Sequence, residues 1–394
     1  MINESMYALG NRRSVIREIF EYCKGRAAEI GAENVFDFSI GNPSAPPPAE
    51  VSDAAIRLLR EESAVRLHGY TSAQGDIGVR RAIASHIRTR FGVDMTPDLL
   101  YMTCGAAASL TISLKALMLP EDECVVFAPF FTEYRVFIEN AGGKVVVSKP
   151  EATTFQIDVA DLTACLTPRT KAVILNSPNN PSGVVYSEKT VCAVCDVLRT
   201  KAREFGHPIY LIADEPYREL VFDGIDVPYL MNYYDNTVVC YSYSKALSLP
   251  GERIGYIAVP KSVTDHDKLY AAVCGAGRSL GYVCAPAFMQ RLVARCAAMT
   301  SDLEAYRHNR DLLYPSLVAM GYECVSPDGA FYLFVKAPNG DAPAFSEAAK
   351  ALNILAVPGD DFGCPGYLRL SYCVDHAMIL RSLPAFRQLR ESFS

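Results

Sequence analysis

The sequence contains 394 residues, of which 50% are hydrophobic and 21% charged, with a formal net charge of −6 at pH 7. Such a chain can bury a large core without cross-links, so we expect one large domain and a smaller one. Its basic residues are dispersed along the chain, which argues against nucleic-acid binding. No segment supplies the roughly 20 apolar residues that a membrane helix needs.

Location and cysteine chemistry follow from the same inspection. The N-terminus lacks the basic start and apolar stretch of a secretion signal, so we predict a cytoplasmic protein. The 13 cysteines are odd in number and scattered, which favours reduced thiols. Cys192 and Cys195 share one face of a helix predicted over 187–205. Without a second cysteine or histidine pair at zinc-like spacing, we interpret them as structural and expect no metal.

The first forty residues lead into a turn at Gly41, which is followed by the stiff linker Pro46–Pro48. We expect this N-terminal segment, residues 1–45, to pack with the smaller domain. A large domain is predicted over 46–285.

The middle of the chain alternates short β-rich runs with longer helical stretches, which predicts an α/β domain with a mostly parallel sheet. In open α/β sheets, ligands bind beyond the carboxyl ends of the strands. Asn176, Asp214 and Ser242 follow such runs and are therefore candidate site residues. The runs are Leu100–Thr103, Cys124–Phe127, Lys144–Val147, Ala172–Leu175, Ile209–Ala213, Thr237–Tyr241 and Ile254–Val259.

The chain changes character in its last hundred or so residues. One long helical stretch is predicted from about Ala285 to Ala319 and is followed by short strands at Phe331–Val335 and Tyr367–Tyr372. This pattern predicts a smaller, separate domain over 286–394.

Two junctions between strand and loop can bind polar ligand groups. At the first, the backbone amides of Gly105, Ala106 and Ala107 can face a phosphate at a helix N-terminus, although Ala-rich helix starts are common without one. At the second, within residues 176–183, the amide of Asn180 can donate to a ligand phenolate and to a substrate carboxylate. The alternative for the second segment is a rigid loop.

Asp214 ends another apolar run and is followed by Tyr217. A carboxylate here can pair with a protonated pyridine nitrogen and keep the ring an electron sink, as expected for pyridoxal phosphate. Tyr217 can reach the phenolic oxygen of that ring. The alternative is an ordinary strand-terminal aspartate that caps the next helix.

Lys245 lies just past a predicted buried strand, with Ser242 and Ser244 before it and Arg253 eight residues after it. A lysine amine can form a Schiff base with an aldehyde, and hydroxyls with an arginine can hold a phosphate. Together they indicate a phosphorylated aldehyde cofactor. Ser-x-Ser-Lys alone is a common surface tetrapeptide, so the prediction depends on the neighbouring motifs.

Taken in this order, the motifs resemble the class I and II aminotransferases of pyridoxal phosphate fold type I, particularly their aspartate-aminotransferase-like bacterial branch. The resemblance covers nearly the whole chain and implies an α/β fold, with a large domain around a mostly parallel seven-stranded sheet and a smaller α+β domain. It runs through Gly41, Tyr70, Gly105, Ala106, Ala107, Phe131, Asn180, Asp214, Tyr217, Ser242, Lys245, Arg253 and Arg369.

The resemblance implies catalytic and substrate-binding roles. Lys245, with Asp214 and Tyr217 beside it, would hold pyridoxal 5'-phosphate as an internal aldimine and then shuttle a proton between Cα and C4'. The large domain would thus be the cofactor-binding one. A second group would bind the substrate α-carboxylate, namely Arg369, Asn180 and the backbone of Gly41.

Cofactor contacts are implied in the same way. Phe131 would stack on the ring, and Ser242, Ser244 and Arg253 would complete the phosphate cup. Tyr70 would contact the cofactor phosphate of the neighbouring subunit, which implies a homodimer with shared active sites.

Substrate specificity is open on these residues. Bacterial relatives of this branch often carry a lysine where this chain has Ala106–Ala108, so the resemblance does not imply dicarboxylate specificity. In the helix-like segment from Arg13 to Arg17, an arginine either borders the substrate side chain and recognises a distal carboxylate or lies on a solvated helix face, which is the commoner case.

We predict a ping-pong aminotransferase that moves the amino group of an L-amino acid to a 2-oxo acid, with 2-oxoglutarate as the expected acceptor. The same site could instead catalyse β-elimination at a carbon–sulfur bond, decarboxylation or racemisation, since fold does not settle reaction. A cofactor-binding regulator would need a DNA-reading module, and neither end of the chain is basic enough to supply one.

Overall fold

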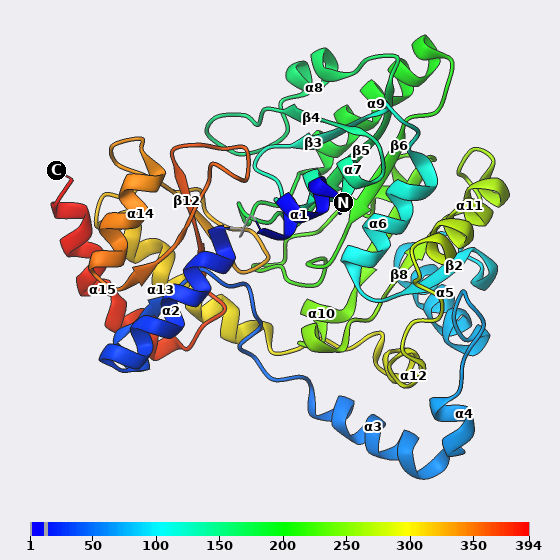
Figure 1. Cartoon of the computed structure of the whole chain (residues 1–394), viewed down its shortest axis with the longest axis horizontal. Coiled ribbons are helices and arrows are strands. Elements are labelled where there is room, and N and C mark those ends of the chain that lie inside the picture. Colours follow the sequence, from blue (N-terminus) through cyan, green and yellow to red (C-terminus); the bar gives the residue numbers. More distant parts are fainter. Residues whose placement is uncertain (1, 12–14, 394) are drawn as a thin grey trace.

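A seven-stranded sheet forms the centre of the larger of two lobes, in a computed structural model that describes residues 2–11 and 15–393 (Figure 1). The strand order is β2-β8-β7-β6-β5-β3-β4, in which β8 runs antiparallel to both neighbours and the other adjacent pairs are parallel. This confirms the predicted mostly parallel sheet. Its strands are β2 (Leu100–Thr103), β3 (Glu123–Phe127), β4 (Lys144–Ser148), β5 (Thr170–Asn176), β6 (Tyr210–Asp214), β7 (Thr237–Ser242) and β8 (Gly255–Ala258).

Near-continuous apolar sequence explains why these segments become buried strands. Successive residues of a strand point to opposite faces of the sheet. Accordingly Val125 and Leu211 pack in one hydrophobic core, whereas Val126 and Ile212 pack in another. Because both faces are covered, apolar residues are needed at every position, as is usual for parallel sheets.

Helices cover the two faces of this sheet (Figure 1). On one face α6 contacts β7 and β8 and packs against α11. The predicted helix at 187–205 is α9, which begins at Glu188 because the hydroxyl of Ser187 caps its first turn. The helices of this lobe are α3 (Ala49–Glu61), α4 (Ala64–His68), α5 (Ile77–Phe91), α6 (Ala106–Leu117), α7 (Glu133–Asn140), α8 (Val159–Cys165), α9 (Glu188–Phe205), α10 (Tyr243–Ala246), α11 (His266–Ser279) and α12 (Ala287–Cys296).

The smaller lobe is built on a three-stranded antiparallel sheet of order β11-β12-β9 with its own hydrophobic core. Helices α13 and α15 pack against each other, and α14 contacts β11 and β12. The elements are α13 (Leu303–Ala319), β9 (Tyr332–Lys336), α14 (Ala342–Ala351), β10 (Ile354–Leu355), β11 (Val357–Pro358), β12 (Tyr367–Ser371) and α15 (His376–Glu391).

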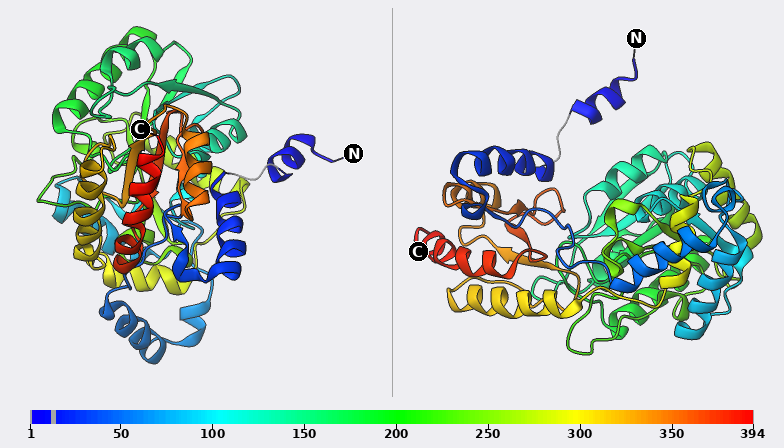
Figure 2. Two further views of the ribbon diagram at one scale, coloured as in Figure 1. Left: turned by 90° about the vertical axis from the view of Figure 1, so that its left-hand side faces the viewer. Right: turned by 90° about the horizontal axis from the view of Figure 1, so that it is seen from below.

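The N-terminal segment joins the smaller lobe through backbone pairing. Strand β1 (Phe36–Asp37) pairs in parallel with β10, and α2 (Val15–Ile30) contacts β11. Helix α1 (Glu4–Asn11) has no buried residue and projects away from the body in Figure 2. Short 3-10 helices occur at Ala32–Asn34, Pro97–Leu99, Leu230–Asn232 and Pro250–Glu252.

The long helical stretch predicted from about 285 to 319 is wrong in one respect, because it is two helices. Helix α12 ends at Cys296, and α13 begins only after Asp302, whose side chain accepts a hydrogen bond from the Glu304 amide. That cap is the local start signal for α13 that the prediction overlooked. Met289 and Val293 of α12 pack in a core of the larger lobe, so the first helix after residue 286 lies with the larger lobe.

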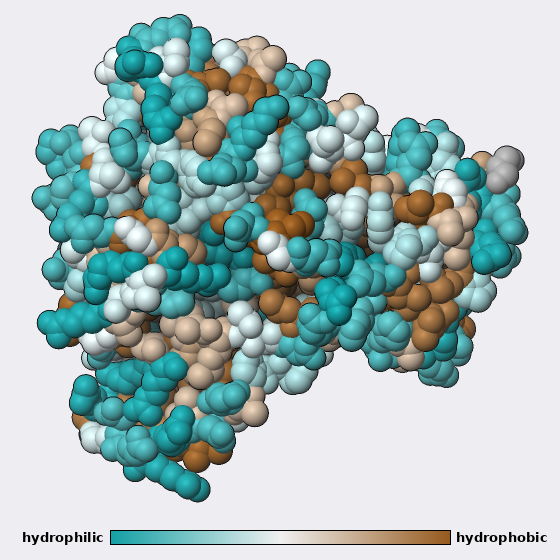
Figure 3. Space-filling model, turned by 180° about the vertical axis from the view of Figure 1, so that it is seen from behind, coloured by the Kyte–Doolittle hydropathy of each residue, from teal (hydrophilic) through white to brown (hydrophobic). Residues whose placement is uncertain are grey.

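The molecular surface seen from behind is mostly polar (Figure 3). On that face, hydrophobic side chains show both near the junction of the two lobes and on the smaller lobe. Among the described helices, none is long and apolar enough to cross a membrane.

Candidate active site

The carboxyl ends of β5, β6 and β7 bring three predicted residues to one edge of the sheet. Asn176 and Asp214 are register partners on adjacent strands, and the side-chain amide of Asn176 donates to the Asp214 carbonyl at 2.9 Å. Ser242 ends β7, the next strand along. The site therefore begins where ligands bind in open α/β sheets.

Asp214 is 4% exposed and has one oxygen engaged and one free. The Tyr134 hydroxyl donates to Oδ2, whereas Oδ1 is buried without a hydrogen-bond partner among the described residues. Burial raises the pKa of Asp214 to about 7, and the hydrogen bond from Tyr134 opposes part of that rise. A buried acceptor without a donor is costly, and the protonated nitrogen of a pyridine ring is a donor of the kind that would satisfy it.

Lys245 lies on the short helix α10, directly after β7. Its Nζ donates to the Gly41 carbonyl at 2.6 Å and lies 5.3 Å from the centre of the Phe331 ring. The pKa of Lys245 is lowered to about 8, chiefly by burial; Cys373 opposes this shift, and the positive charges of Arg369 and Arg253 contribute to it. A larger share of this amine is neutral near pH 7 than for an ordinary lysine, which is the form that attacks an aldehyde.

A group of candidate anion ligands, called here the candidate anion site, lies where β2, β8 and β7 meet. Gly255 of β8 is the register partner of both Thr103 and Ser242, so the loops that follow β2 and precede β8 lie together. A Cβ atom on Gly105, the N-cap of α6, would lie 3.0 Å from the Arg253 guanidinium. The guanidinium therefore borders the helix N-terminus that exposes the Ala106 and Ala107 amides.

Hydroxyl groups complete the candidate anion site. The Ser242 and Ser244 hydroxyl oxygens are 2.6 Å apart, and the Ser244 amide donates to the Ser242 hydroxyl. Backbone amides at a helix start, two hydroxyls and an arginine are the groups that hold a phosphate.

Arg369 on β12 is 3% exposed and brings the smaller lobe into the site. It donates to the Asn180 side-chain oxygen at 3.1 Å and to the Ser39 carbonyl at 2.6 Å. Its Nε is buried without a hydrogen-bond partner among the described residues. Gly41 lies two residues from Ser39, so the structure brings together the three residues predicted for the substrate carboxylate.

The site also contains two tyrosines that the sequence did not single out. Tyr134 donates to Asp214, and its ring lies edge-on to Phe131 with 5.6 Å between ring centres, which places Phe131 near the aspartate. The Tyr332 hydroxyl lies 2.9 Å from that of Tyr217. Both tyrosines look like core residues in the sequence, so no local signal could have identified them.

Tyr70 is the predicted site residue that the structure leaves apart from the others. Its side chain is 100% exposed, so it packs on nothing in the described part of its own chain. In the segment considered above for a distal carboxylate, Arg13 lies outside the described residues, whereas Arg17 is exposed on α2.

Comparison with known proteins agrees with this geometry. A model of the family "Aminotransferase class I and II" matches residues 33–386. The aspartate/prephenate aminotransferase of Thermus thermophilus is 32% identical over 357 residues, which cover 89% of each chain. A crystal structure of an amino transferase from Eubacterium rectale superposes with a TM-score of 0.98, at 54% identity over 100% of this chain and 99% of that one.

A second solved structure is the aspartate aminotransferase of Thermus thermophilus with maleate, which has a TM-score of 0.86 at 26% identity over 99% of this chain and 100% of that one. These likenesses span both lobes and every strand that contributes a site residue. The chain therefore belongs to the aminotransferase class I and II family.

Proposed function

We propose that this aminotransferase holds pyridoxal 5'-phosphate on Lys245 and transfers the amino group of an L-amino acid to a 2-oxo acid. The observation that carries the proposal is the pair of buried, unsatisfied groups that share a site with the lysine. Among the residues that the structure describes, no donor contacts Asp214 Oδ1 and no acceptor contacts Arg369 Nε. This oxygen and this nitrogen are the partners that a pyridinium nitrogen and an α-carboxylate require.

The residues present fit this cofactor. Asp214 would accept from the ring nitrogen, and Tyr217 would donate to the phenolic oxygen. Phe131 offers its ring for stacking, and the phosphate would lie between Arg253 and the amides of residues 105–107. When bound, pyridoxal phosphate supplies the electron sink for charge that develops at the substrate Cα.

The residues of the chain then orient the substrate and move its proton. Arg369 and Asn180 would hold the α-carboxylate, which fixes the bond from Cα to its hydrogen relative to the ring. The Lys245 amine would take the proton from the substrate Cα and return it to the cofactor carbon C4', on the other side of the nitrogen atom. Its pKa of about 8 suits a group that must both accept and give a proton near neutral pH.

We propose 2-oxoglutarate as the common acceptor and a ping-pong sequence of two half-reactions. The relative named above for aspartate and prephenate, and the aspartate aminotransferase solved with maleate, support acidic substrates. The chain's own clamp accounts only for the α-carboxylate, so the side-chain preference must be measured.

We further propose that two copies share their active sites through Tyr70. Its complete exposure supports a contact outside its own chain, and the partner would be a second copy with its phosphate group bound. A protein without this contact would bind the cofactor more weakly.

The decisive experiment offers single amino acids, without any 2-oxo acid, to protein loaded with pyridoxal phosphate. An aminotransferase releases at most one 2-oxo acid per site, then stops until an acceptor such as 2-oxoglutarate is added. The Lys245→Ala variant should release none. Continuous formation of pyruvate and ammonia from cysteine-like amino acids would instead establish β-elimination and overturn the proposal.

A further inference from the structure

The Tyr70 loop, defined as residues 69–76, connects α4 to α5 and combines an exposed tip with a buried support. Its Tyr70 side chain is 100% exposed, whereas Gln290 of α12, which contacts the loop at Thr71 and Asp76, is 0% exposed. Surface loops usually satisfy their backbone groups with water or with nearby residues. Burying the side-chain amide of Gln290 costs free energy of desolvation, which its hydrogen bonds to the loop must offset.

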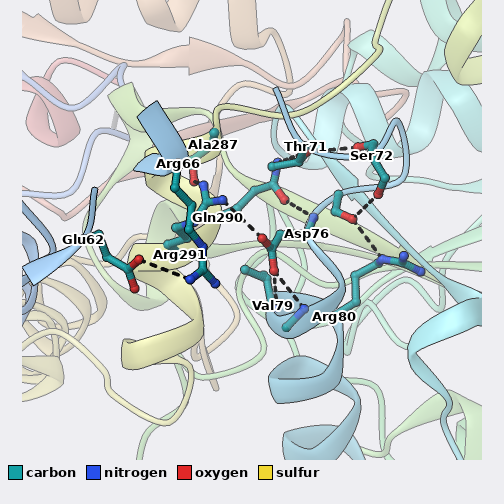
Figure 4. A network of polar contacts seen from close by, with 12 residues as sticks. Glu62, Arg66, Thr71, Ser72, Asp76, Val79, Arg80, Ala287, Gln290 and Arg291 are labelled. Carbon is teal, nitrogen blue, oxygen red and sulfur yellow. Dashed lines mark hydrogen bonds and ion pairs between the residues drawn. The ribbon is translucent and has the colours of Figure 1, made fainter. Parts of the chain in front are cut away.

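Gln290 ties the two ends of the Tyr70 loop to one point. Its side-chain oxygen accepts from the Asp76 amide at 2.8 Å. Its side-chain nitrogen donates to the Thr71 hydroxyl at 3.3 Å and to the Ala285 carbonyl at 2.7 Å. Figure 4 shows the Gln290 side chain between Thr71 and Asp76.

Further bonds fix the second half of the loop (Figure 4). Asp76 accepts from the Gly78 and Val79 amides at the start of α5 and from the Arg291 guanidinium at 3.2 Å. Arg80 donates to the Gly75 carbonyl at 3.2 Å. The backbone that carries Tyr70 is therefore anchored, although the tyrosine itself touches nothing in the described part of its own chain.

Anchoring the base of an otherwise free side chain reduces the entropy that would be lost when that side chain docks. We propose that Gln290 is a positioning residue that acts through Tyr70 on the active site of a second copy of this chain. The inference rests on the proposed function, in which Tyr70 reaches the partner's phosphate site, and it adds the residue that prepares this contact.

Replacement of Gln290 by methionine keeps the length of the side chain but removes its hydrogen bonds to the loop. The site that receives the loosened Tyr70 should bind pyridoxal phosphate roughly tenfold more weakly, which corresponds to about 1.4 kcal/mol, the order of one hydrogen bond. The site on the substituted chain itself should be unaffected.

Hybrid dimers test this difference directly. Two copies with different affinity tags are co-expressed and purified through both tags, and one copy carries Lys245→Ala, so a single lysine remains. In the first hybrid Gln290→Met lies on the Lys245→Ala chain. Tyr70 of that chain would contact the cofactor site of the other chain, which retains Lys245. In the second it lies on the chain with the working lysine. Both hybrids contain the same substitutions and differ only in their distribution.

The measurement is the dissociation constant of pyridoxal phosphate, from the visible absorption that appears only when the cofactor is linked to a lysine. A hybrid with Lys245→Ala alone is the reference. We expect weakened binding in the first hybrid and reference binding in the second. Equal weakening in both would show a purely structural role, and weakening only in the second would show an effect within the chain; either result overturns the inference.

Tyr70→Phe in the same two arrangements separates this inference from the proposed function. If Tyr70→Phe shows the effect across the dimer but Gln290→Met does not, only the role of Gln290 is wrong. If the reference hybrid binds no cofactor, the proposed function fails and this inference with it. If Tyr70→Phe has no effect across the dimer, the proposed sharing of active sites fails and this inference with it, whereas the proposed amino transfer is left to its own experiment. Should Gln290→Met not fold, Thr71→Val removes one bond of Gln290 to the loop and is judged by the same outcomes.

Discussion

The hydroxyl of Tyr332, at the start of β9, lies 2.9 Å from that of Tyr217, which follows β6. This contact joins the sheet of the smaller lobe to that of the larger one inside the candidate site. Tyr332 also lies beneath the Arg369 guanidinium, 4.8 Å from its ring centre. A Cβ atom on Gly41 would lie only 2.0 Å from the Tyr332 hydroxyl, which explains the need for glycine there.

Tyr332→Phe tests whether this contact tunes the cofactor. With Tyr217 donating to the phenolic oxygen, Tyr332 would donate to Tyr217 and strengthen that bond. In Tyr332→Phe the phenolic oxygen of the cofactor would be less stabilised as an anion. The Lys245 nitrogen that is bonded to the cofactor would then hold its proton more tightly. We expect the midpoint of the pH titration of the visible absorption to rise, and kcat/KM to fall roughly fivefold to tenfold.

Tyr322→Phe is the matched control for that measurement, because Tyr322 donates to the Phe386 carbonyl at 2.8 Å in the core of the smaller lobe. It should reduce thermal stability without moving the titration. Identical titrations for the two variants would contradict the role given to Tyr332.

Asp214→Asn should stabilise the cofactor-free protein while impairing catalysis. The folded-state pKa of Asp214, about 7, lies above the ordinary value near 4. The folded state therefore holds the proton more tightly, and stability is lost as pH rises from about 4 through 7. We expect the free energy of unfolding of the cofactor-free variant to exceed that of the unchanged protein by roughly 1–4 kcal/mol at pH 8, with no difference near pH 4.

Thermal unfolding of both cofactor-free proteins across this pH range provides the comparison. A variant that is less stable than the unchanged protein at pH 8 would show that Asp214 is not strained in the absence of a partner. The same variant, loaded with cofactor, should transaminate far more slowly because an amide cannot balance the charge of a pyridinium ring.

Lys245 should react with amine-specific reagents at lower pH than a surface lysine does. Burial lowers the pKa of Lys245 to about 8, so the neutral amine dominates above that pH. Labelling of the cofactor-free protein, followed by peptide mass spectrometry, should give a midpoint near 8 for Lys245. Lys268, whose side chain is 82% exposed, calibrates the reagent in the same sample. A midpoint for Lys245 near the ordinary value of about 10.4 would refute this prediction.

Arg369→Lys tests the carboxylate clamp. Lysine keeps the charge but loses the planar fork that makes two parallel hydrogen bonds. We expect kcat/KM for amino acids and 2-oxo acids to fall about 100-fold, equivalent to roughly 3 kcal/mol. Slow reaction with a simple amine that lacks a carboxylate should be unchanged, as should the affinity for pyridoxal phosphate. An equal loss with the amine would point to a distorted site.

The sequence predicted the sheet well because its strands are short apolar runs with polar residues at their ends. Asp214 and Ser242 stand out by position as well as by chemistry. Tyr134 does not, because it precedes Asp214 by 80 residues and reaches it only once α7 packs beside the sheet. Tyr332 lies in a run that predicts a strand, and its contact with Tyr217 depends on how the two lobes meet.

The break between α12 and α13 shows a limit of predicting helix boundaries from apolar periodicity. Apolar periodicity continues through this region, and only the capping side chain of Asp302 marks the new start. The segment matters for the site because the Ser301 amide donates to the Ala246 carbonyl at 2.7 Å, directly after Lys245. Periodicity alone cannot report a contact between residues so distant in the sequence.

The complete exposure of Tyr70 has a thermodynamic consequence for a protein that assembles as proposed. Binding linkage is reciprocal, so the factor by which pairing tightens the hold on the cofactor is also the factor by which the cofactor tightens pairing. The concentration of pyridoxal phosphate would then control the degree of assembly as well as the occupancy of the site. Diluting the protein would separate the two copies, so specific activity would decrease as the protein concentration is lowered, even at a fixed substrate concentration.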